Sequence, residues 1–392
     1  MSHLTHSHLH EFFKNKELNQ LYLAVAIMTF GEALISIFVP IYLYKLNYPI
    51  YSIVFYFFLI CFSFVMLSYP GAKIVSRLGT KHAILISTPS VALYYLGLRA
   101  LETQSWLFFI LPILLASRLV LYNYGYHLNF ITHSDRKKRG KEVSFIGALS
   151  ILVSAIAPLI GGFIAYYSFS TLYLTGAVVI VLGTIPLFLG KDVHEAIKFT
   201  PKDLIQGIFS KKHRGMFVSF AGYAIESVIG RIIWPIFLIT ILLTLKKTGF
   251  VVMLSMLVSL LVFYIIGKVT DKYDKVKLLK LGTLLYFFAW VGRLFANTTY
   301  KILFIDSYKN ITEKVLHIPW SAHSYDLAMR RGYFSFIVGR EIIFNLTRIV
   351  VMPFLALIFF IGFYPFLISF IIAALFSIGY VFIDKSQSFF LS

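Results

Sequence analysis

The sequence is poor in cysteine and in acidic side chains. It contains one cysteine, Cys61, and 17 acidic residues against 36 basic ones in a chain of 392 residues. A lone cysteine excludes a disulfide framework and a cysteine-based metal site within one chain. Charged residues make up only 14% of the chain, whereas 59% of it is hydrophobic. No soluble domain of this size needs so many apolar side chains, so the composition predicts a protein that crosses the lipid bilayer many times.

The formal net charge of +19 could suggest a nucleic-acid partner. The basic residues are spread over many short turns between apolar runs, however, which is a signal of membrane topology and argues against nucleic-acid binding. The sequence also lacks a G-x-x-x-x-G-K-[ST] phosphate loop, paired metal ligands and a nucleophile motif. We therefore expect no cofactor. The N-terminal histidines are expected to be solvated rather than to bind a metal: His3, His6, His8 and His10.

Twelve apolar runs are each long enough, at about twenty residues, to span the hydrocarbon core of a membrane. They cover residues 20–44, 49–70, 82–100, 105–130, 143–167, 170–189, 215–243, 249–267, 278–297, 302–325, 334–360 and 364–384. Lysine and arginine concentrate in alternate connections between these runs, so the positive-inside rule places both termini in the cytoplasm. The expected location is the cytoplasmic (inner or plasma) membrane, with many passes and a monomeric chain.

A constant offset of 195 residues relates the two halves of the sequence. It separates Pro40 from Pro235, Pro158 from Pro353, and the basic turn at residues 72–82 from the one at residues 267–277. Three matches at one offset indicate a tandem duplication. The predicted organisation is a tail (1–19), a six-helix bundle (20–189), a linker (190–214), a second six-helix bundle (215–384) and a tail (385–392). Thr200 and Pro201 are typical of a helix start, so an amphipathic interfacial helix is expected in the linker, the alternative being a plain linker.

The two basic turns resemble the signature turn of the major facilitator superfamily, G-x-x-x-D-[RK]-x-G-x-[RK]-[RK]. The matching positions, called the gate residues here, are Ser76, Arg77, Gly79, Lys81, Gly267, Asp271 and Lys272. The resemblance implies an all-α fold of twelve transmembrane helices in two pseudo-symmetric bundles. In the family the acid of the turn closes the gate. The first turn has Ser76 in its place, so that gate should be weaker or need another acid, and Asp271 is the predicted gate acid of the second turn.

A second sequence element resembles one that is found in family members that work as exporters. Ala157 to Gly162 reads A-P-L-I-G-G, close to the G-P-x-x-G-G element that many of them carry in the fifth helix. The alternative is that the small residues only allow two helices to pack closely in lipid.

Ionisable residues at membrane depth are costly, so each is a candidate for function. The candidates for substrate binding or coupling are Glu32, Arg118, Tyr122, Glu226, Arg231, Trp234, Glu313, His317, Glu341 and Arg348. At a rise of about 1.5 Å per residue, Glu313 and Arg348 lie at similar depth, and so do His317 and Glu341, which predicts two pairs. Arg293 and Asp306 are expected to form a structural charge pair.

The function that these residues and the resemblance indicate is secondary active transport of a small solute by alternating access. Proton coupling through Glu32, Glu226 or Glu313 is a hypothesis, and fixed ion pairs between helices are the alternative for each of them. Export is slightly favoured as the direction. Two other classes stay open: a polytopic membrane enzyme, and a non-transporting membrane receptor or scaffold.

Overall fold

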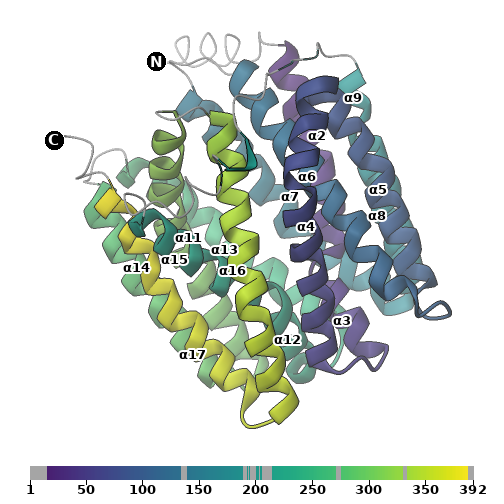
Figure 1. Cartoon of the computed structure of the whole chain (residues 1–392). Helices are drawn as coiled ribbons and strands as arrows, with labels where there is room; N and C mark the ends of the chain where they lie inside the picture. The colour runs from purple at the N-terminus through teal and green to yellow at the C-terminus, as the bar shows by residue number, and fades with distance from the viewer. Residues whose placement is uncertain are drawn as a thin grey trace, which may run out of the picture.

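The computed structural model describes residues 16–133, 139–188, 192, 194, 200–202, 204, 214–270, 275–329 and 333–386. Every regular element among these residues is a helix (Figure 1). The predicted gate residues Asp271 and Lys272 lie outside the described part, as do most of both tails and most of the linker. In the linker, the amide of Leu204 donates to the carbonyl of Thr200 at 3.2 Å, and Leu204 is buried.

The first half of the chain folds into helices that follow one another through short turns. They are α2 (Lys16–Ile35), α3 (Phe38–Lys45), α4 (Ile50–Leu78), α5 (Thr80–Ala100), α6 (Leu107–His133), α7 (Arg139–Tyr167), α8 (Phe169–Gly183) and α9 (Ile185–Phe188). The second half contains α11 (Arg214–Val228), η2 (Ile229–Ile233), α12 (Trp234–Leu242), α13 (Leu245–Thr270), α14 (Lys275–Gly292), η3 (Arg293–Phe295), α15 (Thr299–Met329), α16 (Tyr333–Ile361), α17 (Pro365–Ser377) and η4 (Ile378–Ser386).

Ten of the described helical segments are long and apolar enough to cross a membrane. The helices α13 and α15, of 26 and 31 residues, have the length of a membrane span and occupy the other two predicted positions. Large apolar side chains cover the outer surface of the bundle, for example Phe109, Phe354 and Phe360 at 58%, 63% and 70% exposure. A surface of this kind is stable against lipid rather than water.

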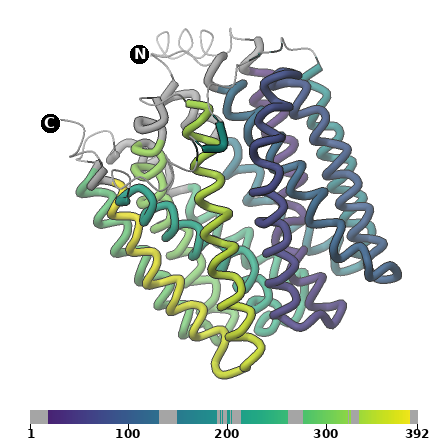
Figure 2. The backbone as a smooth tube through the Cα atoms, viewed as in Figure 1, coloured from purple at the N-terminus to yellow at the C-terminus, as the bar shows by residue number. Residues whose placement is uncertain are grey.

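The two halves form two bundles that lie side by side, as the purple-to-blue and green-to-yellow segments of Figure 2 show. The extensive contacts between them are made by α7 against α13 and by α4 against α16. We call the end of the bundle at which α2 begins the terminal end, and the opposite end the far end (Figure 1). Toward the far end α3 also contacts α12, and Lys246 donates to the hydroxyl of Tyr167 at 3.2 Å.

Small residues set the distance between α7 and α13. A Cβ added to Gly249 would lie 2.2 Å from the carbonyl oxygen of Pro158, and one added to Gly162 would lie 2.6 Å from that of Leu245. Backbone therefore packs directly on backbone at this contact. The A-P-L-I-G-G element thus serves close packing between the two halves, which was one of its two interpretations.

Proline breaks the first and seventh spans at corresponding positions. The ring of a proline clashes with the carbonyl four residues earlier, which is Ser36 for Pro40 and Arg231 for Pro235. At the first of these places α2 gives way to α3, and at the second the π-helical turn η2 interrupts α11 and α12. At the end of η2 the amide of Trp234, the first residue of α12, donates to the carbonyl of Ile229, five residues back. The widened turn carries Arg231, an exposed side chain.

Candidate functional site

A charged group joins three helices in the middle of the first half. Arg118 of α6 donates to the carboxylate of Glu32 of α2 at 2.9 Å and to the hydroxyl of Ser87 of α5 at 3.2 Å. Its guanidinium also lies 3.7 Å from the ring centre of Tyr122. Arg118 is 1% exposed and the side chain of Glu32 is 40% exposed. The arrangement holds a buried cation through a fixed ion pair with a partly accessible acid.

A buried carboxylate occupies the corresponding region of the second half. Glu226 of α11 accepts hydrogen bonds from the hydroxyls of Tyr286 of α14 and Tyr380 of η4, at 2.9 and 2.8 Å. Glu226 is 4% exposed and has no ion-pair partner among the described residues. The hydroxyl of Tyr380 also lies 3.2 Å from Nε2 of His317 on α15. Tyr380 therefore bridges a buried acid and a histidine.

The predicted pairs of the tenth and eleventh spans are not the ones that form. Glu313 accepts from Lys309 of its own helix at 2.9 Å, and not from Arg348. Glu341 accepts from the adjacent Arg340 at 2.9 Å, and not from His317. Lys309 is the partner of Glu313 because side chains four residues apart on one helix are neighbours on its surface.

Two arginines of the second half have only neutral hydrogen-bond partners among the described residues. Arg348 donates to the hydroxyl of Ser227 at 3.0 Å and contacts the side-chain oxygen of Asn345 at 3.5 Å. Arg231 donates to the hydroxyl of Tyr223 at 3.3 Å. Neither has a carboxylate partner within the part of the chain that the structure describes.

A cavity of about 380 Å³ lies between the two halves. Helices α4 and α6 contribute Phe64, Leu119 and Asn123 to its wall, and the second half contributes the remaining residues. Those are Tyr223, Arg231, His317, Trp320, Ser321, Arg340, Glu341, Phe344, Asn345 and Arg348. Four predicted site residues are among them. The other predicted substrate or coupling residues, Glu32, Arg118, Tyr122, Glu226, Trp234 and Glu313, are not among its lining residues. Glu226 is linked to the wall through Tyr380 and His317.

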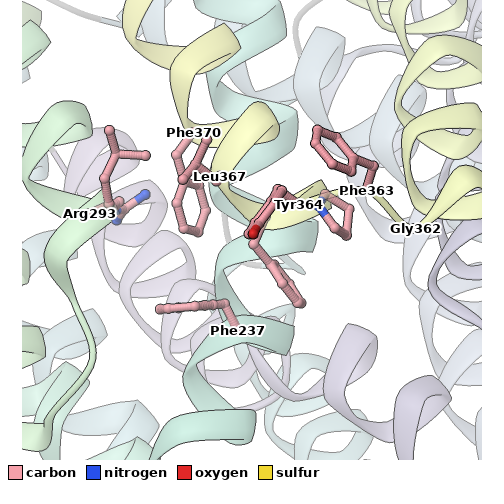
Figure 3. Close-up of a pocket in the computed structure, with 10 residues that line it drawn as sticks. Phe237, Arg293, Gly362, Phe363, Tyr364, Leu367 and Phe370 are labelled. Atoms are coloured by element: carbon pink, nitrogen blue, oxygen red, sulfur yellow. The ribbon is translucent and has the colours of Figure 1, made fainter.

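A second cavity, of about 500 Å³, lies toward the far end of the second half. Figure 3 shows Arg293 on one side of it, the ring of Phe237 below, and Phe363 and Tyr364 opposite. Arg293 is 2% exposed and donates to Asp306 at 3.0 Å. Trp234 stacks on Arg293 at 3.9 Å, so this predicted site residue lies against the charge pair and not in the central cavity. The other described residues of its wall are apolar or aromatic, and Arg293, the one charged residue among them, is paired with Asp306.

The first gate turn has Ser76 where the signature has an acid, but an acid from another part of the chain binds to it. The carboxylate of Asp192, from the linker, accepts from the backbone amide of Lys81 at 2.9 Å and contacts Nδ1 of His82. Gly79 makes room for it, because a Cβ there would lie 2.5 Å from the carboxyl group, and its φ of 90° also favours glycine. Asp192 thus binds the N-terminus of α5, where a negative charge is favourable. Ser76 and Arg77 end α4 beside this turn.

Sequence reasoning missed the neutral partners of the charged residues. Tyr223, Tyr286 and Tyr380 are three of 25 tyrosines in a chain that is 18% aromatic, and no spacing distinguishes them. Asp192 lies 110 residues from His82. Among the described residues, no group of three or more histidine, cysteine or acidic side chains is arranged to hold a metal ion.

Membrane-length helices in two bundles, with a charged cavity between them, define a membrane transporter of small molecules. Residues 21–308 match the family model described as Major Facilitator Superfamily, so the chain belongs to this family. It is a secondary transporter and not an enzyme.

A crystal structure of a D-xylose-proton symporter resembles this chain with a TM-score of 0.70. The match covers 92% of this chain and 96% of that chain, at 14% sequence identity. At such low identity the likeness shows a shared fold. No curated protein matches the sequence.

Proposed function

We propose that the protein couples solute transport to proton movement across the cytoplasmic membrane, with Glu226 as the proton-binding group. The two bundles would rock about the central cavity and expose it in turn to each side, with both chain termini in the cytoplasm. The single observation that carries the proposal is the environment of Glu226. It is a buried carboxylate whose described hydrogen bonds come only from tyrosine hydroxyls.

The other two acids are less suited to this role. Glu32 binds Arg118 and Glu313 binds Lys309, each at 2.9 Å. A carboxylate in an ion pair keeps its charge because the cation stabilises it. A buried carboxylate without such a partner is costly when charged, so gaining and losing a proton changes its energy strongly. Lys309 lies 6.0 Å from the ring centre of Tyr286, so it is a neighbour of this group rather than its partner.

The contacts also supply a route for the proton. His317 lines the cavity, and its Nε2 meets the Tyr380 hydroxyl, which in turn donates to Glu226. A proton on Nε2 of His317 can pass to the hydroxyl oxygen of Tyr380 while the hydroxyl proton passes to the Glu226 carboxylate. Tyr380 is unchanged in charge after this exchange, and the proton has moved from the cavity to the buried acid.

A pH jump on protein-containing membranes tests the proposal without a known solute. Membranes with purified protein are adsorbed on an electrode, and the charge displaced on acidification is recorded for the wild type and for Glu226→Gln, Glu32→Gln and Glu313→Gln. We expect Glu226→Gln alone to remove the displacement, because glutamine keeps the size and the tyrosine contacts but binds no proton. A wild-type signal in Glu226→Gln would contradict the proposal.

For the direction of transport we propose export, on the resemblance of residues 157–162 to the exporter element. Solute movement in right-side-out and inside-out vesicles tests it. Accumulation only in the inside-out vesicles is expected, and accumulation only in the right-side-out vesicles would contradict it.

A further inference from the structure

The central cavity has more positive charge than its own acids compensate. Three arginines line it, and Glu341 is the one carboxylate among the described residues of its wall. Glu341 is bound by Arg340, with both side chains only 12–13% exposed. Arg231 and Arg348 therefore bring the charge that the described wall leaves uncompensated.

These two arginines converge on one aromatic ring. Arg231 donates to the hydroxyl of Tyr223, and the guanidinium of Arg348 lies 6.0 Å from the centre of the same ring. Arg348 also donates to Ser227, which is one helical turn before Arg231 on the chain. Their planar groups thus border the same part of the cavity from α16 and from the π turn of the seventh span.

We propose that this cavity binds a small organic anion, whose carboxylate or phosphate group is held by Arg231 and Arg348. The inference rests on the proposed transport function and names the substrate class of the same site. Guanidinium groups match both anions with paired hydrogen bonds, and they do so most strongly where water is excluded. Tyr223, Trp320 and Phe344 form an aromatic wall beside the arginines, and this wall fits an apolar body on the anion.

The π turn is what presents Arg231 to this site. Arg231 stands four residues before Pro235, so its carbonyl is released from the regular helix pattern at this point. Glu226, on the regular helix before the turn, is buried in the bundle, whereas Arg231 is exposed. Glu226, the proposed proton-binding residue, and Arg231, a proposed anion-binding residue, therefore lie on the same span but in different surroundings.

Thermal unfolding of the purified full chain in detergent tests the anion site. The probes, at constant ionic strength, are benzoate, phenyl phosphate, the neutral benzamide and the cationic benzylamine. We expect at least one of the two anions to raise the melting temperature of the wild type, and benzamide and benzylamine to leave it unchanged. A shift with benzoate alone assigns a carboxylate substrate, and a shift with phenyl phosphate alone assigns a phosphate.

Arg231→Gln and Arg348→Gln should each weaken binding of the effective anion about tenfold or more, since each removes a charged hydrogen-bond donor. Lys247→Gln is the matched control, because Lys247 is exposed and is not one of the residues that line the cavity, and it should bind like the wild type. Where a glutamine variant does not fold, the lysine variant replaces it. It keeps the charge without the planar fork, and should bind between the wild type and glutamine levels.

Three results would overturn the anion site: no shift with either anion, an equal shift with benzamide or benzylamine, or an unchanged shift in both arginine variants. The pH-jump experiment distinguishes a failure of the anion site from a failure of the proposed proton coupling, because it tests Glu226 and not the arginines. Loss of the displacement in Glu226→Gln, together with equal binding of benzamide and benzoate, would retain proton coupling and reject the anion site.

Discussion

Gly249→Ala changes a close backbone contact between the two halves of the protein. The new Cβ would lie 2.2 Å from the carbonyl oxygen of Pro158, whereas ordinary contact begins at 3.4 Å. The obstacle is backbone rather than a flexible side chain, so α13 must move away from α7 by about 1.2 Å. The substitution thus separates the two bundles along the contact that holds them together toward the far end.

The energetic cost follows from two opposing terms. Overpacking of a tight contact costs about 1–3 kcal/mol, and a clash that only a backbone shift relieves is expected in the upper part of that range, at about 2–3 kcal/mol. Replacing glycine by alanine inside a helix returns up to about 1 kcal/mol. The net destabilisation expected for Gly249→Ala is about 1–2 kcal/mol, or a decrease of a few degrees in the melting temperature.

The matched control is Gly339→Ala in α16, where an added Cβ meets no atom within 4 Å. This substitution gains the higher helix propensity of alanine without a clash, so the variant should be as stable as the wild type or slightly more stable. Thermal unfolding of the three proteins in the same detergent decides the matter. A Gly249→Ala protein that melts with the wild type would refute the idea that backbone packing sets the distance between the halves.

Two further predictions concern charges outside the central cavity. Asp192→Ala should destabilise the protein by about 1 kcal/mol because α5 loses the acceptor at its N-terminus, and Asp192→Asn, which keeps an acceptor oxygen, should cost less. Equal melting temperatures of the two variants and the wild type would show that Asp192 does not stabilise the turn. Arg293→Met should cost about 3–5 kcal/mol by leaving Asp306 buried and unpaired, and adding Asp306→Leu should recover much of that loss. A double variant that is less stable than Arg293→Met would contradict a simple charge pair.

The sequence was sufficient for the fold because the relevant signals are long and repeated. Most of the apolar runs predict helices that begin and end within a few residues of those observed, as in 107–133 for the predicted 105–130, whereas α4 continues past the predicted end at residue 70 to Leu78. The offset of 195 residues predicts that Pro40 and Pro235 act alike, and each follows a break in its span. Both signals depend on length and hydrophobicity, which the bilayer enforces everywhere along the chain.

The site was less predictable because its partners are neutral or distant in sequence. Burial singles out Glu226 as a costly charge, but its tyrosine partners lie 60 and 154 residues away. Counting the helix rise per residue predicts a pair between Glu313 and Arg348, because it compares the depths of residues in the membrane and not the directions of their side chains. Lys309, four residues earlier on the same helix, is the partner that forms.

The most direct test of proton coupling through Glu226 uses proteoliposomes that contain a pH-sensitive dye. It measures the proton movement that accompanies solute transport. Gradients of phenyl phosphate, glutamate and D-xylose are imposed on vesicles with the wild type, Glu226→Gln or Glu313→Gln. Solute-driven pH change with at least one anion is expected for the wild type and for Glu313→Gln, and its loss is expected for Glu226→Gln. Proton movement in Glu226→Gln at the wild-type rate would show that this buried carboxylate does not couple transport to protons.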